Sequence, residues 1–258
     1  MASLTPSSRI AILAAGKSTR MRSPIPKIFH TLQGQPLVRY VVDAARTANG
    51  DRPILVLSPE HRAAVERIFG GEVAYVVQTE QRGTGHAVMS IPSELLAGSQ
   101  HLVVLYGDQP LLTSPTIRRL IEAHAAAHCP LTMMTTTVPS FEGQYEEFKT
   151  FGRVLRQADG TLDRIVEYKD ASDGVKAVRE VNPGYYCFNI TWLYAHLPRL
   201  KDENAQKEYY LTDLVGMARR EGTTVAVVPI DEPWEGLGVN TPEALVLAEQ
   251  LLQKRMKT

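Results

Sequence analysis

Cysteine is scarce in this chain of 258 residues, and neither sign of charge is in excess. The two cysteines, Cys129 and Cys187, lie far apart and form no C-x-x-C pair. We therefore expect no disulfide framework and no zinc site, and both thiols are predicted to be buried small apolar groups. The 28 basic residues balance the 28 acidic ones. Because proteins that bind nucleic acids or membrane surfaces usually carry a basic excess, neither partner is expected.

Long hydrophobic runs are also missing. The first eight residues are polar and lack the apolar core of a signal peptide. No apolar run approaches the length needed to span a bilayer. Together with the few cysteines, these features predict a protein of the reducing cytoplasm. The length allows one full hydrophobic core, or one domain with a small additional lobe.

Short β-rich runs alternate with amphipathic helical stretches along most of the chain. The predicted strands are residues 10–13, 54–57, 73–77, 102–106, 131–138 and 224–229. Helices are predicted to begin at Pro36, Ser58-Pro59, Ser114-Pro115 and Thr241-Pro242, the last three with an N-cap residue before the proline. This alternation predicts an α/β fold, a Rossmann-like and mostly parallel sheet with helices on both faces.

The alternation breaks between about residues 143 and 194. Residues 151–157 and 162–168 flank the turn signal Ala158-Asp159-Gly160, which predicts an antiparallel hairpin. Residues 181–190 could add another strand. We therefore expect a single domain over residues 1–258 with a small inserted β lobe at about 143–194.

The loop after the first strand combines small residues with two cations. Residues 13–16 leave room for a ligand to approach main-chain N–H groups, and Arg20 and Lys27 follow. Amides plus fixed positive charge favour a polyphosphate. The loop is not a P-loop, because Ala11 stands where the first glycine is required, and it lacks the glycines of a dinucleotide fingerprint. A tight strand-to-helix turn with two solvated cations is the alternative.

Polar groups follow two other predicted strands at the same edge of the sheet, where ligands bind in such folds. The Gln78 amide can both donate and accept, as the edge of a pyrimidine requires, and Gly83 and Gly85 would let main-chain groups reach a flat base. Asp108 could hold a hard cation such as Mg²⁺. The alternatives are a surface loop, a turn-forming Asp108 and, for Asn240, a helix cap.

The small lobe carries groups able to hydrogen-bond sugar hydroxyls or an amide. They lie in Gly152-Arg153, in 167–170 and in 182–184. Hairpin turns and solvated charges are the alternative reading of these segments. Tyr209, Tyr210 and Asp213 could simply begin and pack a helix. No Ser-His-Asp arrangement and no metal-binding histidine pair stands out in the sequence.

Taken in order, these segments resemble the uridylyltransferase domain of the bifunctional N-acetylglucosamine-1-phosphate uridylyltransferases. The likeness runs from about Arg9 to Glu249 and implies the nucleotide-diphospho-sugar transferase type of fold. It rests on residues 13–21 with Lys27, 78–87, 106–108, 152–153, 167 with 169–171, 182, 204–206 with 208–213, and 238–240.

The resemblance implies a role for individual residues. Arg20, Lys27 and Asp108 would be catalytic, with Arg20 and Lys27 on the phosphates. Asp108 and Asn240 would hold the Mg²⁺ cofactor. The remaining substrate contacts would be Leu13, Ala14, Ala15 and Gly16 for the nucleotide, Gln78, Gly83 and Thr84 for uracil, Tyr106 and Gly107 for the ribose and sugar, and Gly152, Glu167 and Asn182 for the amino sugar.

The implied reaction joins UTP and N-acetylglucosamine 1-phosphate into UDP-N-acetylglucosamine, a cell-wall precursor, and releases pyrophosphate. Three alternatives stay open: the same chemistry on another sugar 1-phosphate (N-acetylgalactosamine or glucose), a transferase for CTP or GTP, and a non-catalytic sensor of nucleotide sugars. Gln78 and Gly83-Thr84 argue against CTP or GTP. The retained Arg20, Lys27, Asp108 and Asn240 argue against a sensor.

Some positions depart from the family pattern. Ser18 and Lys207 stand where glycine is usual, and Phe151 replaces a common tyrosine. Pro183 replaces a threonine after Asn182, which removes a hydroxyl and an N–H from the sugar side. No hexapeptide repeats of a left-handed β-helix are present. Acetyl transfer and the trimer that such a helix builds are therefore not expected.

Overall fold

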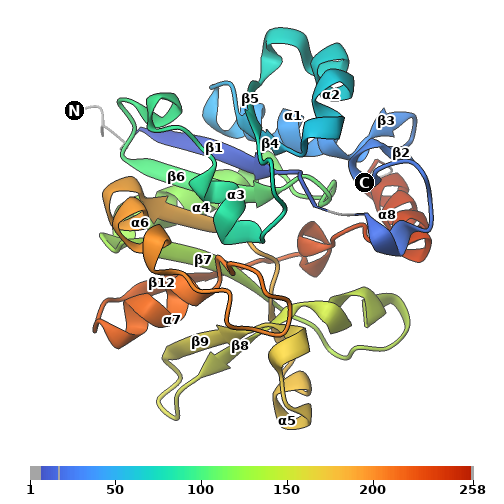
Figure 1. Cartoon of the computed structure of the whole chain (residues 1–258). Helices are drawn as coiled ribbons and strands as arrows, with labels where there is room; N and C mark the ends of the chain where they lie inside the picture. The colour runs from blue at the N-terminus through green and yellow to red at the C-terminus, as the bar shows by residue number, and fades with distance from the viewer. Residues whose placement is uncertain (1–6, 17, 257–258) are drawn as a thin grey trace.

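One ten-stranded sheet organises the chain, and the computed structural model describes residues 7–16 and 18–256 of it (Figure 1). The strand order is β5-β4-β1-β6-β11-β7-β10-β8-β9, with β12 also paired to β7. The strands are β1 (Ser8–Leu13), β4 (Ile54–Leu57), β5 (Ala74–Val77), β6 (His101–Tyr106), β7 (Leu131–Thr137), β8 (Gly152–Arg156), β9 (Leu162–Val166), β10 (Glu180–Asn182), β11 (Tyr186–Asn189) and β12 (Val225–Pro229). A separate two-stranded sheet pairs β2 (Thr31–Leu32) with β3 (Gln35–Pro36).

The helices lie between these strands in the order that the alternation predicted. They are α1 (Leu37–Asn49), α2 (Arg62–Phe69), α3 (Thr84–Met89), α4 (Ser114–Ala127), α5 (Asp173–Lys176), α6 (Ile190–His196), α7 (Asp213–Arg220) and α8 (Pro242–Arg255). Of the helices in the described part of the chain, none combines the length and apolar content needed to cross a bilayer.

The parallel half of the sheet confirms the predicted α/β fold. Strands β5, β4, β1 and β6 are parallel, and the last residue of β1, Leu13, pairs with Val56 and Tyr106. The carboxyl ends of β1 and β6 therefore meet at one edge. All six strands predicted from the β-rich runs occur within two residues of their predicted bounds.

The prediction of one strand at residues 181–190 is wrong. The segment forms two strands, because Pro183 has no N–H for a ladder and Gly184 turns the chain at a φ of +93°. The second of them, β11, lies in the central sheet, antiparallel to both β6 and β7. The first, β10, pairs with β8, which forms the predicted hairpin with β9. The division into a domain and a lobe at about 143–194 stays a prediction.

Side chains alternate between the two faces of the sheet, as a strand buried on both sides requires. Ile10 and Ile12 of β1 belong to a core with α1, α2 and α4. Ala11 and Leu13 belong to a second core with α3, α6 and α7. Because both faces are covered, only the edges of the sheet are open to a ligand.

Two of the predicted helix caps are corrected. Thr241 caps α8 as expected, since its side chain accepts a hydrogen bond from the N–H of Ala244. The cap of α4 is Thr113 rather than Ser114, which is already helical. Ser58 precedes a 3₁₀ turn before α2, and its Oγ contacts His61 Nδ1 at 2.9 Å instead of capping. At α4 the cap therefore lies one residue earlier than predicted, because Thr113 Oγ1 accepts from the Thr116 N–H.

Candidate functional site

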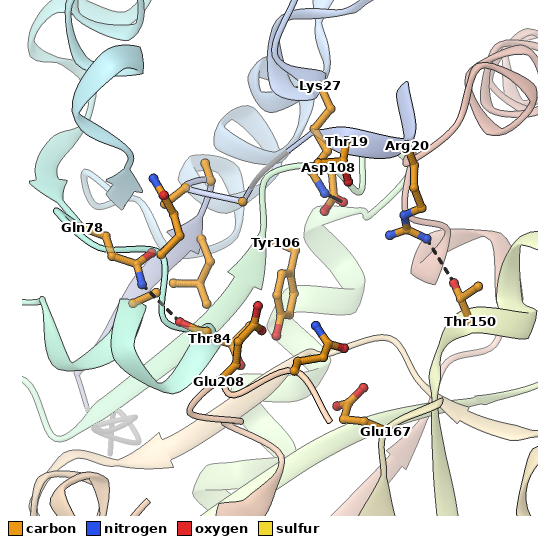
Figure 2. Close-up of a pocket in the computed structure, with 18 of the residues that line it drawn as sticks. Thr19, Arg20, Lys27, Gln78, Thr84, Tyr106, Asp108, Thr150, Glu167 and Glu208 are labelled. Carbon is orange, nitrogen blue, oxygen red and sulfur yellow. Dashed lines mark hydrogen bonds and ion pairs between the residues drawn. The ribbon is translucent and has the colours of Figure 1, made fainter. Parts of the chain in front are cut away.

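Two adjoining cavities of about 740 and 270 Å³ lie at the carboxyl ends of β1 and β6. Residues at the ends of these strands form the inner wall, and residues of the β8–β9 hairpin and of the loop 206–212 form the outer wall. Figure 2 shows these side chains pointing toward one another around the larger cavity. The residues that line both cavities are Arg20, Lys27, Thr84, Tyr106, Asp108, Thr150, Glu167, Gln206 and Glu208.

The structure brings almost all of the predicted site residues to these cavities. The larger cavity is lined by Leu13, Ala14, Ala15, Gly16, Arg20, Lys27, Gln78, Gly83, Thr84, Tyr106, Asp108 and Glu167. The smaller one adds Gly152, Asn182 and Asn240. Segments that lie far apart along the chain therefore share one site. The individual roles that the resemblance assigned to these residues remain predictions.

Gly107 is the one predicted residue that lines neither cavity. Its N–H donates to the Leu13 carbonyl at 2.9 Å, and a Cβ at this position would lie 3.1 Å from the Ala14 Cβ. A side chain would therefore push the β6 end away from the loop after β1. This packing requirement accounts for the glycine, and its predicted contact with the substrate has no support from the cavity.

A cation lies between the two predicted metal ligands, and it is the ammonium of Lys27. Lys27 Nζ donates to Asp108 Oδ2 at 2.5 Å and to Asn240 Oδ1 at 2.8 Å. The Val239 N–H donates to the Asp108 carbonyl at 2.8 Å, which fixes the loop before α8 against the end of β6. The carboxylate and the carboxamide oxygen thus face one position, and both are the hard oxygen donors that suit Mg²⁺.

The loop after β1 has its cations near the cavity but no α-helix behind it. The next described element is the 3₁₀ turn Thr19–Met21, so no long helix dipole adds to the positive charge. The Lys27 N–H donates to Ser18 Oγ at 2.7 Å, which holds the Lys27 backbone against the loop. Arg20 is exposed, and its Nη1 donates to Thr150 Oγ1 at 3.4 Å. Figure 2 shows Arg20 reaching across the cavity mouth toward Thr150.

Gln78 is buried with its amide orientation fixed. Its Nε2 donates to the Gly83 carbonyl at 3.2 Å and lies 3.0 Å from His86 Nδ1. A carbonyl accepts hydrogen bonds only, so the amide nitrogen must face Gly83. The Oε1 atom is then the group left for a ligand, and it is an acceptor. Gly83 holds this turn at a φ of +104°, and a Cβ there would meet the Tyr209 carbonyl at 2.7 Å.

Glu167 is a carboxylate with a perturbed pKa at the junction of the two cavities. Removal from water raises its pKa to about 6, and the charges of Asp213, Asp170 and Glu208 act in the same direction. The Thr212 hydroxyl donates to Glu167 Oε1 at 3.0 Å and opposes this rise. A carboxylate that lacks a cationic partner is a strong hydrogen-bond acceptor for a ligand hydroxyl.

Asn182 and Gly184 shape the smaller cavity. Asn182 Oδ1 accepts from the Gly184 N–H at 3.0 Å, and its Nδ2 donates to the Tyr186 hydroxyl at 2.6 Å. Each group keeps further hydrogen-bonding capacity for a ligand. Arg153, by contrast, is fully buried and donates to the carbonyls of Lys176, Lys149 and Phe151. Its side chain therefore joins these segments and is not available to a sugar.

Several residues of the cavity walls carried no predicted role. Thr150 stands in a segment without a motif, so no sequence signal marked it. Thr19 belongs to the segment 13–21 that supported the resemblance. Gln206 and Glu208 belong to the segment that supported the resemblance, which was the available signal. Gln109 donates to the carbonyls of Pro183 and Gly236 and joins two loops behind the smaller cavity. These contacts are long-range, and sequence spacing does not reveal them.

Comparison with known proteins gives a consistent result. A family model described as "MobA-like NTP transferase domain" matches residues 10–179. The bifunctional protein GlmU of Geobacter metallireducens is 40% identical over 246 residues, which are 95% of this chain and 50% of that protein. The GlmU proteins of Trichlorobacter lovleyi and Shouchella clausii are 40% and 39% identical, and the match covers 95% of this chain and 52% of each protein. The chain thus spans about half the length of these relatives.

Proposed function

Because this chain belongs to the MobA-like NTP transferase domain family, we propose that it transfers a uridylyl group from UTP to N-acetylglucosamine 1-phosphate. The products are UDP-N-acetylglucosamine and pyrophosphate. Family membership gives the general chemistry, the transfer of a nucleotidyl group from a nucleoside triphosphate. The cavity residues support the choice of UTP and of the amino sugar. The proposed location of the protein is the reducing cytoplasm.

The observation that carries the proposal is the cation position between Asp108 Oδ2 and Asn240 Oδ1. Two hard oxygen donors from distant segments converge there, at the wall shared by both cavities. Asp108 and Asn240 would hold Mg²⁺ in the place where the Lys27 ammonium lies. When bound, Mg²⁺ would supply charge neutralisation for the phosphates of both substrates.

Lys27 and Arg20 neutralise charge during the reaction. A sugar phosphate has its second pKa near roughly 6, so at neutral pH the attacking oxygen is already ionised and needs no general base. The difficulty is the repulsion between two anions and the charge that builds on the departing pyrophosphate. Lys27, once released from Asp108 and Asn240, and the exposed Arg20 are cations of the cavity wall that meet this charge.

Gln78 supports uracil as the base. Its free group toward the ligand is the Oε1 acceptor, and uracil carries an N–H donor between two carbonyl groups. Cytosine has no such N–H at that position, so its edge would place a lone pair against the Gln78 oxygen. A buried acceptor left without a donor costs about 1–3 kcal/mol, which is a preference of roughly 5- to 150-fold.

Glu167 and Asn182 support a sugar in the smaller cavity. Both line this cavity, and both keep acceptor atoms for hydroxyl or amide donors. Glu167 is mostly ionised at neutral pH, because its pKa of about 6 lies below 7. The apolar side chains of Phe151 and Pro183 line the same cavity and offer a surface for a methyl group. An N-acetyl sugar presents both kinds of group.

A pyrophosphate-release assay tests the proposal. We expect release with UTP, N-acetylglucosamine 1-phosphate and Mg²⁺ together, and none when the sugar phosphate or the metal ion is omitted. CTP and GTP, and the 1-phosphates of N-acetylgalactosamine and glucose, serve as competing substrates. Faster pyrophosphate release with another sugar phosphate would mean that this other sugar, not N-acetylglucosamine, is the substrate. Binding of UDP-N-acetylglucosamine without any pyrophosphate release would indicate a sensor instead.

The Asp108→Ala variant tests the cation position in the same assay. We expect turnover to fall at least about a hundredfold, the scale of removing one transition-state partner. Asp231→Ala is the matched control, because Asp231 is an exposed aspartate that pairs with Arg119 on the surface. A folded Asp108→Ala protein with turnover near that of the control would refute the role of Asp108.

A further inference from the structure

Two histidines and a cysteine meet in the core at the edge of the sheet opposite the cavities. His101 begins β6, His124 lies on α4 and Cys187 lies on β11. One ring nitrogen of each histidine and the Cys187 Sγ lie within 4.8 Å of one another. His101 starts the strand that ends at Tyr106 on the cavity wall, so the two places are five residues apart along β6, roughly 17 Å.

The register of the sheet explains this meeting. Cys187 pairs with Val103, and both belong to the core that α4 covers. His101 stands two residues before Val103 and therefore points to the same face as Val103. His124 reaches this face from the last turn of α4. The two imidazole rings stand edge to face with their centroids 4.4 Å apart.

Both histidines have a buried ring nitrogen without a partner. His101 is 8% exposed and His124 is 2% exposed, and within the described residues neither His101 Nδ1 nor His124 Nε2 has a hydrogen-bond partner. Each such nitrogen costs about 1–3 kcal/mol when left unsatisfied in the core. The other nitrogen of His124, Nδ1, lies 2.8 Å from the Thr132 hydroxyl. A hydrogen bond of this kind orients a metal-ligating imidazole and leaves Nε2 to bind the ion.

We propose that His101, His124 and Cys187 form a site for a thiophilic metal ion, separate from the Asp108–Asn240 position. Imidazole nitrogens and a thiolate are the donors that select Cu(I) and Zn²⁺ over Mg²⁺. Nitrogen and sulfur ligands stand about 2.0–2.3 Å from such an ion, so the widest pair must approach by roughly 1 Å. Small rotations of the three side chains supply that movement.

The charge balance favours Cu(I) over Zn²⁺. Binding breaks the Cys187 S–H bond, forms a metal–sulfur bond and releases the proton to solvent, with no change of oxidation state. Two neutral imidazoles and one thiolate carry a single negative charge, which a monovalent ion cancels. Zn²⁺ would leave one positive charge buried in a cluster whose three ligands include no carboxylate.

The protonation states of the free cluster agree with this assignment. Burial, helped by the neighbouring His101, lowers the pKa of His124 to about 4, so the ring is neutral at physiological pH and its lone pair is available. Burial also raises the pKa of the Cys187 thiol, so this group is a neutral, unreactive thiol until an ion displaces its proton.

Competition with a coloured chelator tests the site in the whole protein. Under reducing conditions the protein is titrated against Cu(I) held by bicinchoninate, and in a second arm against Zn²⁺ held by a pyridylazo dye. We expect one Cu(I) per chain, with at least a hundredfold weaker affinity in Cys187→Ala and His124→Leu. Zn²⁺ uptake that depends on the same residues would support the metal site but would show that its ion is Zn²⁺ rather than Cu(I).

Two variants separate this site from other metal-binding groups. Cys129→Ser removes the other buried cysteine, and Asp108→Ala removes the active-site carboxylate; both should keep wild-type Cu(I) uptake. Circular dichroism checks that each variant is folded. If His124→Leu does not fold, the Cu(I) affinity of Cys187→Ala alone tests the proposal. The proposal is overturned if folded wild-type protein takes up neither ion, or if uptake is unchanged in Cys187→Ala.

Discussion

Lys27 combines two tasks at a single position. Its ammonium lies between Asp108 and Asn240, and the proposed reaction needs it on the phosphates. An ammonium and Mg²⁺ cannot occupy the same oxygens together, since like charges at contact repel strongly. Metal binding and release of Lys27 toward the substrates are therefore coupled events.

Replacing Lys27 by methionine should separate metal affinity from catalysis. The variant keeps the length of the side chain but removes the competing charge, so Mn²⁺ used as a probe should bind several-fold more tightly without nucleotide. Turnover should fall at least about a hundredfold, because the cation on the phosphates is lost. Mn²⁺ binding is measured by electron paramagnetic resonance. Lys201→Met, at a position 70% exposed, is the control, and unchanged Mn²⁺ affinity in Lys27→Met would contradict the competition.

Glu167 should make the protein less stable as the pH rises. Its folded pKa of about 6 lies above the ordinary value of 4.5, so the folded state holds this proton more tightly than the unfolded state. The free energy of unfolding therefore falls as the pH rises from about 4.5 to 6 and stays lower above that range. Glu167→Gln removes the buried charge and should gain about 2 kcal/mol at pH 8 and nothing at pH 4.

Urea denaturation of Glu167→Gln at pH 4 and pH 8 measures this difference, with Glu203→Gln as the control at a position 74% exposed. The same substitution should raise the KM for the sugar phosphate in the proposed reaction, because the ionised acceptor is lost. A stability gain of equal size at both pH values would show that the effect does not come from ionisation.

At the scale of elements, the turn between β10 and β11 sets the shape of the smaller cavity. Pro183 and Gly184 end one strand and begin the next, and Gly184 lies against the ring of Tyr106 at the end of β6. The strand prediction failed here because it ran the apolar residues 185–188 together with Val181 across Pro183 and Gly184, which are themselves a turn signal. The six runs bounded by clear turn residues were predicted to within two residues, because there the local signals agree.

Gly184→Ala should disturb both the fold and the cavity. The residue has a φ of +93°, and a Cβ would lie 2.2 Å from Tyr106 Cε2, so the ring must move into the cavity. We expect a loss of about 2–4 kcal/mol in the free energy of unfolding and a higher KM. Gly160→Ala is the matched control, since its φ is +84° and nothing lies within 4 Å of the added Cβ. Equal losses in the two variants would mean that the contact with Tyr106 does not matter.

At the scale of the whole molecule, the cavities lie where the carboxyl ends of the central strands meet the β8–β9 hairpin and the loop 206–212. The location of the site at this edge of the sheet could be predicted, because parallel strands place their carboxyl ends together. The contribution of Thr150 and the packing role of Gly107 could not, because they depend on contacts between distant segments. The cluster of His101, His124 and Cys187 was hidden for the same reason.

A ligand that bridges these walls should stabilise the entire chain. UDP-N-acetylglucosamine with Mg²⁺ at a hundred times its Kd should add about 2.7 kcal/mol, since it binds only the folded state. For a chain of this length that is roughly a 5–10 °C rise in Tm. Differential scanning fluorimetry measures the rise, and the part that depends on Mg²⁺ should vanish in Asp108→Ala. A rise that is the same without the metal ion would count against a shared cation.

The hydrogen bond from Lys27 to Asn240 joins residues 213 positions apart. During synthesis on the ribosome, the oxygens around that ammonium cannot assemble until Asn240 has left the exit tunnel. A nascent chain that has folded only its early strands therefore holds Lys27 and Asp108 but not Asn240. In the proposed reaction, catalytic competence would depend on this late contact.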